Sequence, residues 1–153
     1  MELVLEFLEK EDLVFLHQLF TNPQVMASYS EPPIQNVSDA VGFFHRISSD
    51  NNLVFKIILF PYGIKAGICA LHHHNPSEKS AEIGGTLFPE FWGCELIVQA
   101  LHTLIENWAK PKGIEVLFAR TEPNNHGAIS TMVKLGFVLF NIDREELVFR
   151  RKS

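Results

Sequence analysis

The spacing of apolar residues divides the chain into strand-like and helix-like segments. Apolar residues alternate or run together, as β-strands require, over residues 2–8, 53–60, 64–74, 81–88, 114–121, 137–142 and 145–151. They recur every three or four residues, as on one face of a helix, over residues 12–20, 39–47, 97–108 and 128–134. Strands and helices are therefore interleaved along the whole chain.

Turn residues separate these segments. The sequence PYG at 61–63 lies between two strand-like runs and predicts a hairpin. TNP at 21–23 ends the first helix, Pro111 and Gly113 end the third, and Gly136 closes the last. This order predicts an α+β fold, in which helices flank both faces of a mixed, largely antiparallel sheet.

The totals restrict the class of protein. With 153 residues, 46% of them apolar and 20% charged, the chain has the size and composition of one globular domain, which we expect to span residues 1–153. A net charge of −5 argues against a nucleic-acid partner, because such proteins normally present a basic face to the phosphates.

No segment suggests export or a membrane. Residues 1–13 lack a positively charged leader followed by a small-residue cleavage site, and the most apolar stretch, residues 53–71, is interrupted by charged and turn residues. Cys69 and Cys94 have no paired spacing, so we expect two reduced thiols and neither a disulfide framework nor a zinc site. These features predict a cytoplasmic protein.

Two stretches carry a family resemblance. Residues 82–101, EIGGTLFPEFWGCELIVQAL, and residues 121–137, TEPNNHGAISTMVKLGF, resemble the GNAT superfamily of acyl-CoA-dependent N-acetyltransferases, and most of all its ribosomal-protein N-terminal acetyltransferase branch. The resemblance implies the GNAT fold and an enzyme. That enzyme would move an acetyl group from acetyl-CoA to a primary amine, either a protein N-terminus or a small molecule.

The resemblance also implies a cofactor site. In the family, the strand before the helix pairs its backbone with the pantetheine arm, and the following turn wraps the pyrophosphate with backbone N–H groups. The first role would fall to Leu87 and Phe88. The second would fall to Trp92, Gly93, Cys94, Glu95 and Leu96. The physical basis is the anion site at a helix N-terminus, where N–H groups and the helix dipole point outward.

Glu95 and Gln99 depart from this pattern, because they replace the second glycine of the turn and the glutamate of the helix. A carboxylate held about 4 Å from a phosphate charge would weaken binding roughly a thousandfold. Two alternatives remain open. Either Glu95 swings to solvent while its N–H still serves the phosphate, or its carboxylate caps the helix and the cofactor site is lost.

Glu82 matches a position at which relatives place a general base, often acting through water. The alternative is a partner for a charge on a neighbouring strand, or a solvated edge residue. The task of the base depends on the acceptor. A lysine amine is neutral in only one part in about 2,500 at pH 7, whereas an α-amine near pKa 7.7–8.0 asks far less of the base.

The second stretch holds two further candidates. Asn125 matches the asparagine that contacts the cofactor arm in the family, although it could equally be a turn residue after Pro123. Met132 occupies the place at which other branches have a tyrosine acid, and Ala128 stands where this branch often has serine. A thiolate leaving group of pKa about 8.5 needs little help from an acid.

The sequence HHH at 72–74 invites a metal interpretation. Alternation along a strand would send His73 away from His72 and His74, and the sequence shows no nearby carboxylate or cysteine at a recognisable ligand spacing. We therefore expect no metal site. His72 or His74 could instead reach the substrate as a secondary base.

Two functions from different classes follow. The first is the acetyltransferase, with Glu82 as base. The second is a non-catalytic binding or scaffold module with an impaired coenzyme A site, suggested by Glu95, Gln99 and Met132 together. By the family resemblance, residues 29–50 line the acceptor cleft. The sequence leaves the acceptor and the oligomeric state open, a homodimer included.

Overall fold

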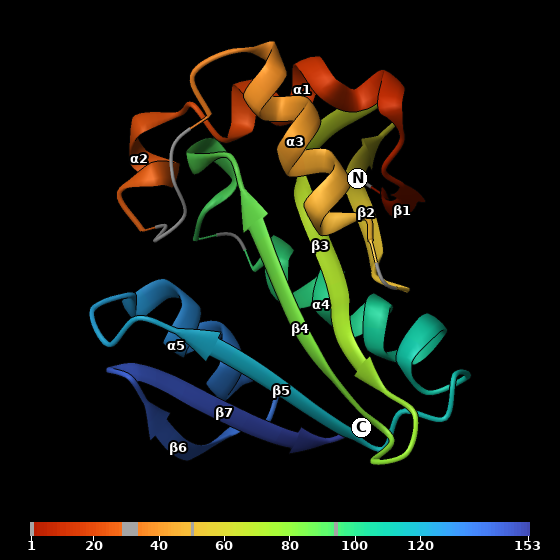
Figure 1. Ribbon diagram of the computed structural model, residues 1–153, viewed down its shortest axis with the longest axis vertical. Coiled ribbons are helices and arrows are strands. Elements are labelled where there is room, and N and C mark those ends of the chain that lie inside the picture. The colour runs from red at the N-terminus through yellow and green to blue at the C-terminus, as the bar shows by residue number, and fades with distance from the viewer. Residues whose placement is uncertain (1, 29–33, 50, 94) are drawn as a thin grey trace.

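A single mixed sheet organises the molecule (Figure 1). The computed structural model describes residues 2–28, 34–49, 51–93 and 95–153. Seven strands lie in the order β1-β2-β3-β4-β5-β7-β6. Their bounds are β1 Glu2–Phe7, β2 Leu53–Phe60, β3 Ile64–Asn75, β4 Ser80–Leu87, β5 Val116–Thr121, β6 Val138–Asp143 and β7 Glu146–Lys152.

The pairing between β4 and β5 divides this sheet in two. Every other neighbouring pair is antiparallel, whereas β4 and β5 run parallel and share only three residue pairs, from Ser80 with Val116 to Glu82 with Phe118. Beyond Glu82 the two strands part, and Figure 1 shows them diverging from their common end. The expected mixed and largely antiparallel sheet is confirmed.

Helices cover both faces, as predicted. They are η1 Lys10–Asp12, α1 Leu13–Leu19, α2 Pro23–Met26, α3 Val37–Ile47, η2 Pro89–Phe91, α4 Leu96–Leu104, η3 Ile105–Ala109, which is π-helical, and α5 His126–Lys134. In Figure 1, α3 crosses one face of the sheet and α4 lies behind the other. None of the helices in these residues is long and apolar enough to span a membrane.

Each face has its own core. One cluster packs α4 and α5 against inward residues of the sheet, among them Phe55, Leu71 and Ile83. The other packs α1, α2 and α3 against the opposite face, where Val54 and Ile68 contribute. Successive strand residues serve opposite cores, which is the alternation that the sequence pattern contains.

One helix was not expected. Asn22 ends the first helix as predicted, but its side-chain oxygen also accepts hydrogen bonds from the N–H groups of Gln24 and Val25 at 3.0 and 3.3 Å. With Pro23 at the first helical position, this is a standard N-terminal cap. The residues TNP therefore begin a helix as well as ending one.

A buried ion cluster ties η1 to the sheet. Asp12 is 2% exposed, and its carboxylate lies 2.9 Å from Nζ of Lys56 and 2.8 Å from Nζ of Lys65. It also accepts a hydrogen bond from the N–H of Glu9 at 2.9 Å. Burial alone would raise the pKa of Asp12, but the hydrogen bonds from Lys65, Glu9 and Lys56 outweigh it and hold that pKa below its usual range.

Candidate active site

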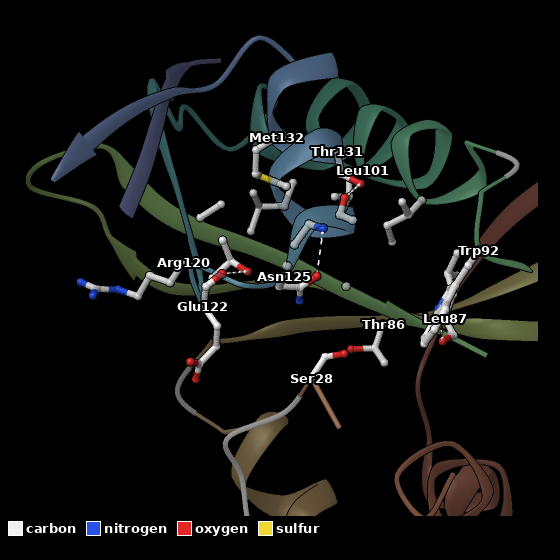
Figure 2. Close-up of a pocket in the computed structure, with 18 of the residues that line it drawn as sticks. Ser28, Thr86, Leu87, Trp92, Leu101, Arg120, Glu122, Asn125, Thr131 and Met132 are labelled. Atoms are coloured by element: carbon white, nitrogen blue, oxygen red, sulfur yellow. Dashed lines mark hydrogen bonds between the residues drawn. The ribbon is translucent and has the colours of Figure 1, made fainter. Parts of the chain in front are cut away.

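The parting of β4 and β5 opens a cavity of about 530 Å³. Its walls come from β4, β5, the first turn of α4 and the first turns of α5 (Figure 2). Glu82 lies at the closed end, where the strands still pair, and Trp92 and Glu95 lie at the α4 end. The cavity therefore connects a carboxylate to a helix N-terminus.

Part of the β4 backbone faces this cavity and does not pair with β3. The N–H of Phe88 donates to the carbonyl of Ala66 on β3 at 2.9 Å. Because hydrogen bonding alternates along an antiparallel strand, the odd-numbered residues Ile83, Gly85 and Leu87 turn their N–H and C=O groups away from β3. The Leu87 carbonyl accepts a hydrogen bond from Trp92 Nε1 at 3.0 Å.

Phe88 does not share this position. Its N–H bonds Ala66, and its carbonyl accepts a hydrogen bond from the N–H of Phe91 at 3.0 Å. Both backbone groups are thus engaged within the protein, so the structure gives no support to the predicted pairing of Phe88 with a cofactor arm. The Phe88 ring packs instead with the α1–α3 core.

Gly85 sets the distance between β4 and α4. A Cβ atom at this position would lie 2.7 Å from Cδ1 of Ile97 and 3.1 Å from the Ile68 carbonyl oxygen. A side chain here would force the Ile97 side chain to move, so glycine favours the close approach of α4. The close packing brings the helix N-terminus to the edge of the cavity.

The turn before α4 leaves that N-terminus open. Gly93 and Glu95 both have left-handed backbone conformations, with φ of 80° and 61°. The Glu95 side chain makes no capping hydrogen bond, so it leaves the first-turn N–H groups of residues 96–98 to other acceptors. Cys94, the remaining predicted residue of this turn, lies outside the described residues.

The Glu95 carboxylate points to α5. Its Oε1 lies 2.8 Å from Nζ of Lys134, and the side chain is 59% exposed. The hydrogen bond and positive charge of Lys134 lower the pKa of Glu95. The alternative in which this carboxylate caps the helix is wrong. The side chain instead points outward to solvent, as in the other alternative.

Asn125 caps α5 and faces the cavity. Its Oδ1 accepts a hydrogen bond from the N–H of Ala128 at 3.1 Å, which confirms the structural role considered for it. The Oδ1 atom is therefore engaged, while Figure 2 shows the amide group directed into the cavity. Met132 is buried and lines the same cavity from the α5 side.

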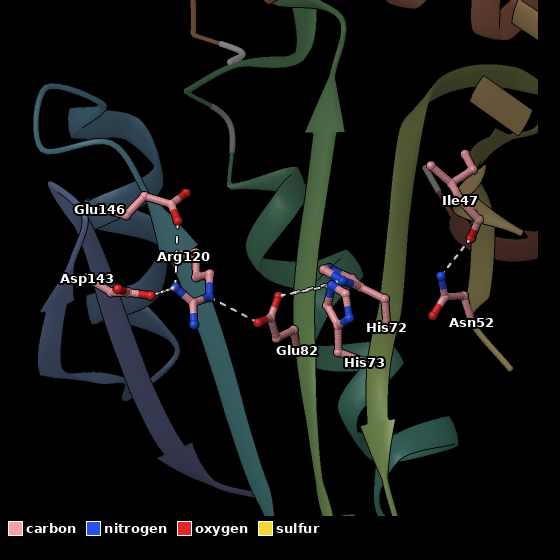
Figure 3. Close-up of polar contacts among 8 residues, drawn as sticks. All are labelled: Ile47, Asn52, His72, His73, Glu82, Arg120, Asp143 and Glu146. Carbon is pink, nitrogen blue, oxygen red and sulfur yellow. Dashed lines mark hydrogen bonds and ion pairs between the residues drawn. The ribbon is translucent and has the colours of Figure 1, made fainter. Parts of the chain in front are cut away.

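A network of charges surrounds Glu82 (Figure 3). Its Oε1 accepts a hydrogen bond from Nε of Arg120 on β5 at 3.0 Å, so Glu82 does pair with a charge on a neighbouring strand. Nη1 of Arg120 lies 3.0 Å from Asp143 and 3.7 Å from Glu146. Three carboxylates thus share one guanidinium, which leaves two formal negative charges uncompensated.

The other Glu82 oxygen faces two histidines. Oε2 lies 3.6 Å from His72 Nδ1 and 3.9 Å from His73 Nε2, too far for a hydrogen bond. Burial lowers the pKa of His72 below its usual value, although the Glu82 charge opposes this effect. His72 lines the cavity; His74 is not among the described lining residues.

The expected alternation at 72–74 is wrong. The register between β3 and β4 shifts between His72 and Asn75, and His73 has a left-handed φ of 53°. This irregularity turns the His73 ring to the same side as His72, with ring centroids 4.8 Å apart. A carboxylate is also near both rings, contrary to the reasoning from sequence spacing.

A second cavity, of about 380 Å³, adjoins the first. It shares His72, Gly84, Gly85 and Thr86 with the larger cavity and is closed by α3, where Phe43 and Arg46 line it. These two residues belong to the segment 29–50, which was expected to line an acceptor cleft. Residues 29–33 and 50 of that segment lie outside the described residues.

Sequence reasoning missed the charged partners. Arg120, Asp143, Glu146 and Lys134 were not singled out, because nothing in their local sequence distinguishes them from solvated charges. The parallel register, which sets Glu82 opposite Phe118, brings Arg120 within reach. No pattern of apolar residues specifies this register, so the sequence held no local signal for Arg120.

Comparison with known proteins gives a family match. Residues 2–138 match the family model described as an acetyltransferase (GNAT) domain. The chain is 27% identical to the spermidine N(1)-acetyltransferase of Escherichia coli (strain K12) over 130 residues, which are 85% of this chain and 69% of that protein.

Solved structures give the same fold. Spermidine N-acetyltransferase from Vibrio cholerae, in complex with CoA and spermine, superposes with a TM-score of 0.80 at 22% identity and covers 97% of this chain and 92% of its own. RimL, a ribosomal alpha-N-protein acetyltransferase, superposes with a TM-score of 0.83 at 19% identity, covering 99% of this chain and 90% of its own.

Proposed function

The chain belongs to the GNAT acetyltransferase family, and from this premise we propose how it moves an acetyl group from acetyl-CoA to a primary amine. The observation that carries the proposal is the parting of β4 and β5 beside the open N-terminus of α4. It joins an anion site, a strand edge and a carboxylate in one cavity.

Acetyl-CoA binds along this cavity with its pyrophosphate at α4. The backbone N–H groups of Gly93, Glu95 and Leu96 surround the phosphates at the start of the helix. The Trp92 N–H, also predicted for this role, instead donates to the Pro89 carbonyl at 3.1 Å. Cys94 belongs to the same turn by sequence. The positive end of the helix dipole adds to the attraction.

The cofactor arm then pairs with the inner edge of β4. Its amide groups take the place of a strand beside Leu87 and Gly85, whose backbone groups face the cavity. The Asn125 amide contributes a donor from the opposite wall, since only its Oδ1 is engaged in capping α5. This arrangement carries the acetyl group toward the closed end, where Glu82 lies.

Glu82 accepts the proton of the attacking amine. One of its oxygens is held by Arg120, which fixes the carboxylate, and the other is open toward the cavity. A base with one fixed and one open oxygen can act directly or through a water molecule. His72 is the second candidate base, because burial favours its neutral form.

The remaining steps need little from side chains. Backbone N–H groups of the β4 edge stabilise the oxyanion of the tetrahedral intermediate. The departing thiolate, with a pKa near 8.5, requires only modest assistance. Met132 supplies no proton, so we expect solvent to reprotonate the thiolate.

The acceptor is a small, positively charged amine. Two uncompensated negative charges surround Arg120, and Glu122 lines the same cavity. Such a site attracts a cation and repels an acidic substrate. The similarity to a protein named as a spermidine acetyltransferase agrees with this chemistry. A protein N-terminus is the second candidate acceptor, through the similarity in fold to RimL.

The rival module, without catalysis, loses its main support. It rested on a Glu95 carboxylate occupying the phosphate site, and this carboxylate instead pairs with Lys134. Gln99 is exposed on the surface of α4, and Met132 is part of the core. Neither side chain brings a charge into the cavity.

Calorimetric titration with acetyl-CoA, followed by an assay of coenzyme A release, tests the proposal. We expect micromolar binding and turnover of polyamines in preference to neutral or acidic amines. Glu146→Gln should lower kcat/KM for a polyamine more than for a monoamine, whereas Glu115→Gln, remote from the cavity and paired with Lys79, should change neither. No binding of any acyl-CoA would refute the function.

We further propose that residues 1–153 act as one domain in the cytoplasm. The family match spans residues 2–138, and β7, which follows, pairs with β5 in the same sheet. The thiol of Cys69 is free and buried, as suits a reducing compartment. Limited proteolysis that yields a stable fragment lacking β7, or fractionation that places the protein outside the cytoplasm, would contradict this.

A further inference from the structure

We propose that His72, His73 and Glu82 bind a divalent transition-metal ion such as Zn²⁺, and that the bound ion occupies the Glu82 carboxylate and inhibits acetyl transfer. The claim that the metal ion binds depends only on these three side chains. The inhibitory half rests on the proposed function, because it requires Glu82 to be the base.

The ligand atoms are already gathered. One ring nitrogen each of His72 and His73 and one Glu82 oxygen lie within 4.8 Å of one another. In a tetrahedral zinc site with bonds of about 2.0–2.2 Å, neighbouring ligand atoms lie about 3.4 Å apart. Closing around an ion therefore requires each side chain to move by about 1 Å or less. His73 is 71% exposed, so its side chain has room to make this movement.

The backbone imposes this arrangement. Consecutive residues of a regular strand point to opposite faces, so two adjacent histidines would not normally reach one carboxylate. Here the register shift after His72 and the left-handed φ of 53° at His73 bring both rings to Glu82. Figure 3 shows the three side chains converging from β3 and β4.

The surrounding charges accept a cation. Arg120 holds the Oε1 atom of Glu82 and leaves Oε2 toward the histidines. A hydrogen bond of this kind fixes a ligating carboxylate in metal sites. The positive charge of Arg120 is offset by Asp143 and Glu146, so the local balance remains negative. A divalent ion therefore meets no net repulsion there.

The donor set selects the class of metal. Two imidazole nitrogens and one carboxylate oxygen suit Zn²⁺, Co²⁺ or Ni²⁺, whereas Mg²⁺ and Ca²⁺ prefer oxygen ligands alone. Three protein ligands leave a fourth position for water. His72 lies at the junction of the two cavities, with Glu82 lining one and His73 the other, so an ion can reach the site from solvent.

The binding test uses untagged, chelator-treated protein and ZnCl₂ in a calorimeter, with MgCl₂ as the negative control. We expect one site of micromolar or tighter affinity. His73→Asn should weaken Zn²⁺ binding by more than about tenfold, and asparagine tolerates the left-handed backbone at this position. The matched control is His74→Asn, which removes the adjacent histidine that lies outside the cluster.

Visible absorption spectroscopy with Co²⁺ is a second test of the site. Co²⁺ in a tetrahedral site absorbs visible light strongly, and this absorption should form with the wild type and His74→Asn but not with His73→Asn. The absence of zinc binding, or equal losses in the two histidine variants, would overturn the site. Octahedral cobalt spectra would overturn the proposed coordination.

Inhibition is measured separately. Zn²⁺ should inhibit the wild type in competition with the amine, and His73→Asn should need at least about ten times more Zn²⁺ for the same inhibition. Equal inhibition of both proteins would overturn the blocking of Glu82. If no acetylation can be detected at all, the proposed function fails, while calorimetry and the cobalt spectra still decide the metal site.

Discussion

Two carboxylates in this protein, Asp12 and Glu82, both pair with basic side chains, but only Asp12 has both of its oxygens engaged by hydrogen bonds. Asp12 is 2% exposed and is held by two lysines and a backbone N–H. Glu82 is 20% exposed and has one oxygen on Arg120, while its other oxygen lies 3.6 Å or more from two histidines. Both belong to charge clusters that link neighbouring parts of the sheet.

The difference separates a structural carboxylate from a reactive one. A buried charge whose every oxygen is engaged holds its surroundings in place, but it has no free lone pair to offer a substrate. A carboxylate that is anchored on one side and open on the other keeps its orientation and can still accept a proton. Partner number, rather than burial alone, distinguishes the two sites.

The largest expected effect is on stability, from Asp12→Ala. Removing this carboxylate leaves Lys56, which is mostly buried, without its partner, and breaking such a buried pair costs about 3 kcal/mol of unfolding free energy. Urea denaturation measures the loss. A change under about 1 kcal/mol, typical of exposed pairs, would show that the cluster is not a structural anchor.

The next effect is on catalysis, from Glu82→Gln. Glutamine keeps an oxygen for Arg120 but is not a base, so kcat/KM should fall about a hundredfold or more, while the melting temperature should move by only about 2 °C. Steady-state kinetics and thermal denaturation on the same preparation provide both numbers. A large loss of stability with unchanged kinetics would show that Glu82 is a structural carboxylate and not the catalytic base.

The pH dependence of stability should follow Asp12. Its pKa is lower in the folded protein than in the unfolded chain, so the unfolded chain takes up more protons as the pH falls. The stabilisation is present above about pH 4, the unfolded value, and is lost below it. Wild-type protein should therefore lose unfolding free energy faster than Asp12→Asn between pH 5 and pH 3, as denaturant titrations would measure.

The smallest expected effect concerns a third carboxylate, Glu95, which has one partner at the surface. Lys134→Ala removes that partner and exposes the negative charge beside the α4 N-terminus, so affinity for coenzyme A should fall about three- to fivefold at low salt and recover at high salt. Calorimetry measures the change.

Two variants control this comparison. The double variant Glu95→Gly with Lys134→Ala should regain affinity, because it also removes the exposed charge. If the double variant stays weak, Lys134 contacts the phosphates itself. Lys112→Ala, in the turn that follows η3, serves as the surface control and should bind normally.

Sequence predicted the elements well because their signals are local. The hairpin around PYG and the end of the last helix at Gly136, which has a φ of 82°, depend on residues a few positions apart. The short helix α2 was missed although its signal was present, since Asn22 and Pro23 form a cap that was interpreted only as a helix end.

The site was predicted less completely because its geometry is not local. Arg120 reaches Glu82 through the parallel pairing of β4 with β5, which no pattern of apolar residues specifies. The orientation of His73 depends on a bulge, and a one-residue irregularity reverses every conclusion drawn from alternation. The course of the Glu95 side chain depends on Lys134, on a different helix.

The parting of β4 and β5 also bears on how the protein behaves in a crowded solution. A strand edge with free N–H and C=O groups readily recruits strands from other molecules, which is how many proteins begin to aggregate. The backbone groups of β4 that turn away from β3, such as those of Gly85, lie inside the molecule, between walls formed by α4, α5 and β5. A narrow ligand with amide groups can enter there more easily than another polypeptide strand. The sheet can therefore bind a ligand at this edge while edge-to-edge pairing with other molecules is limited.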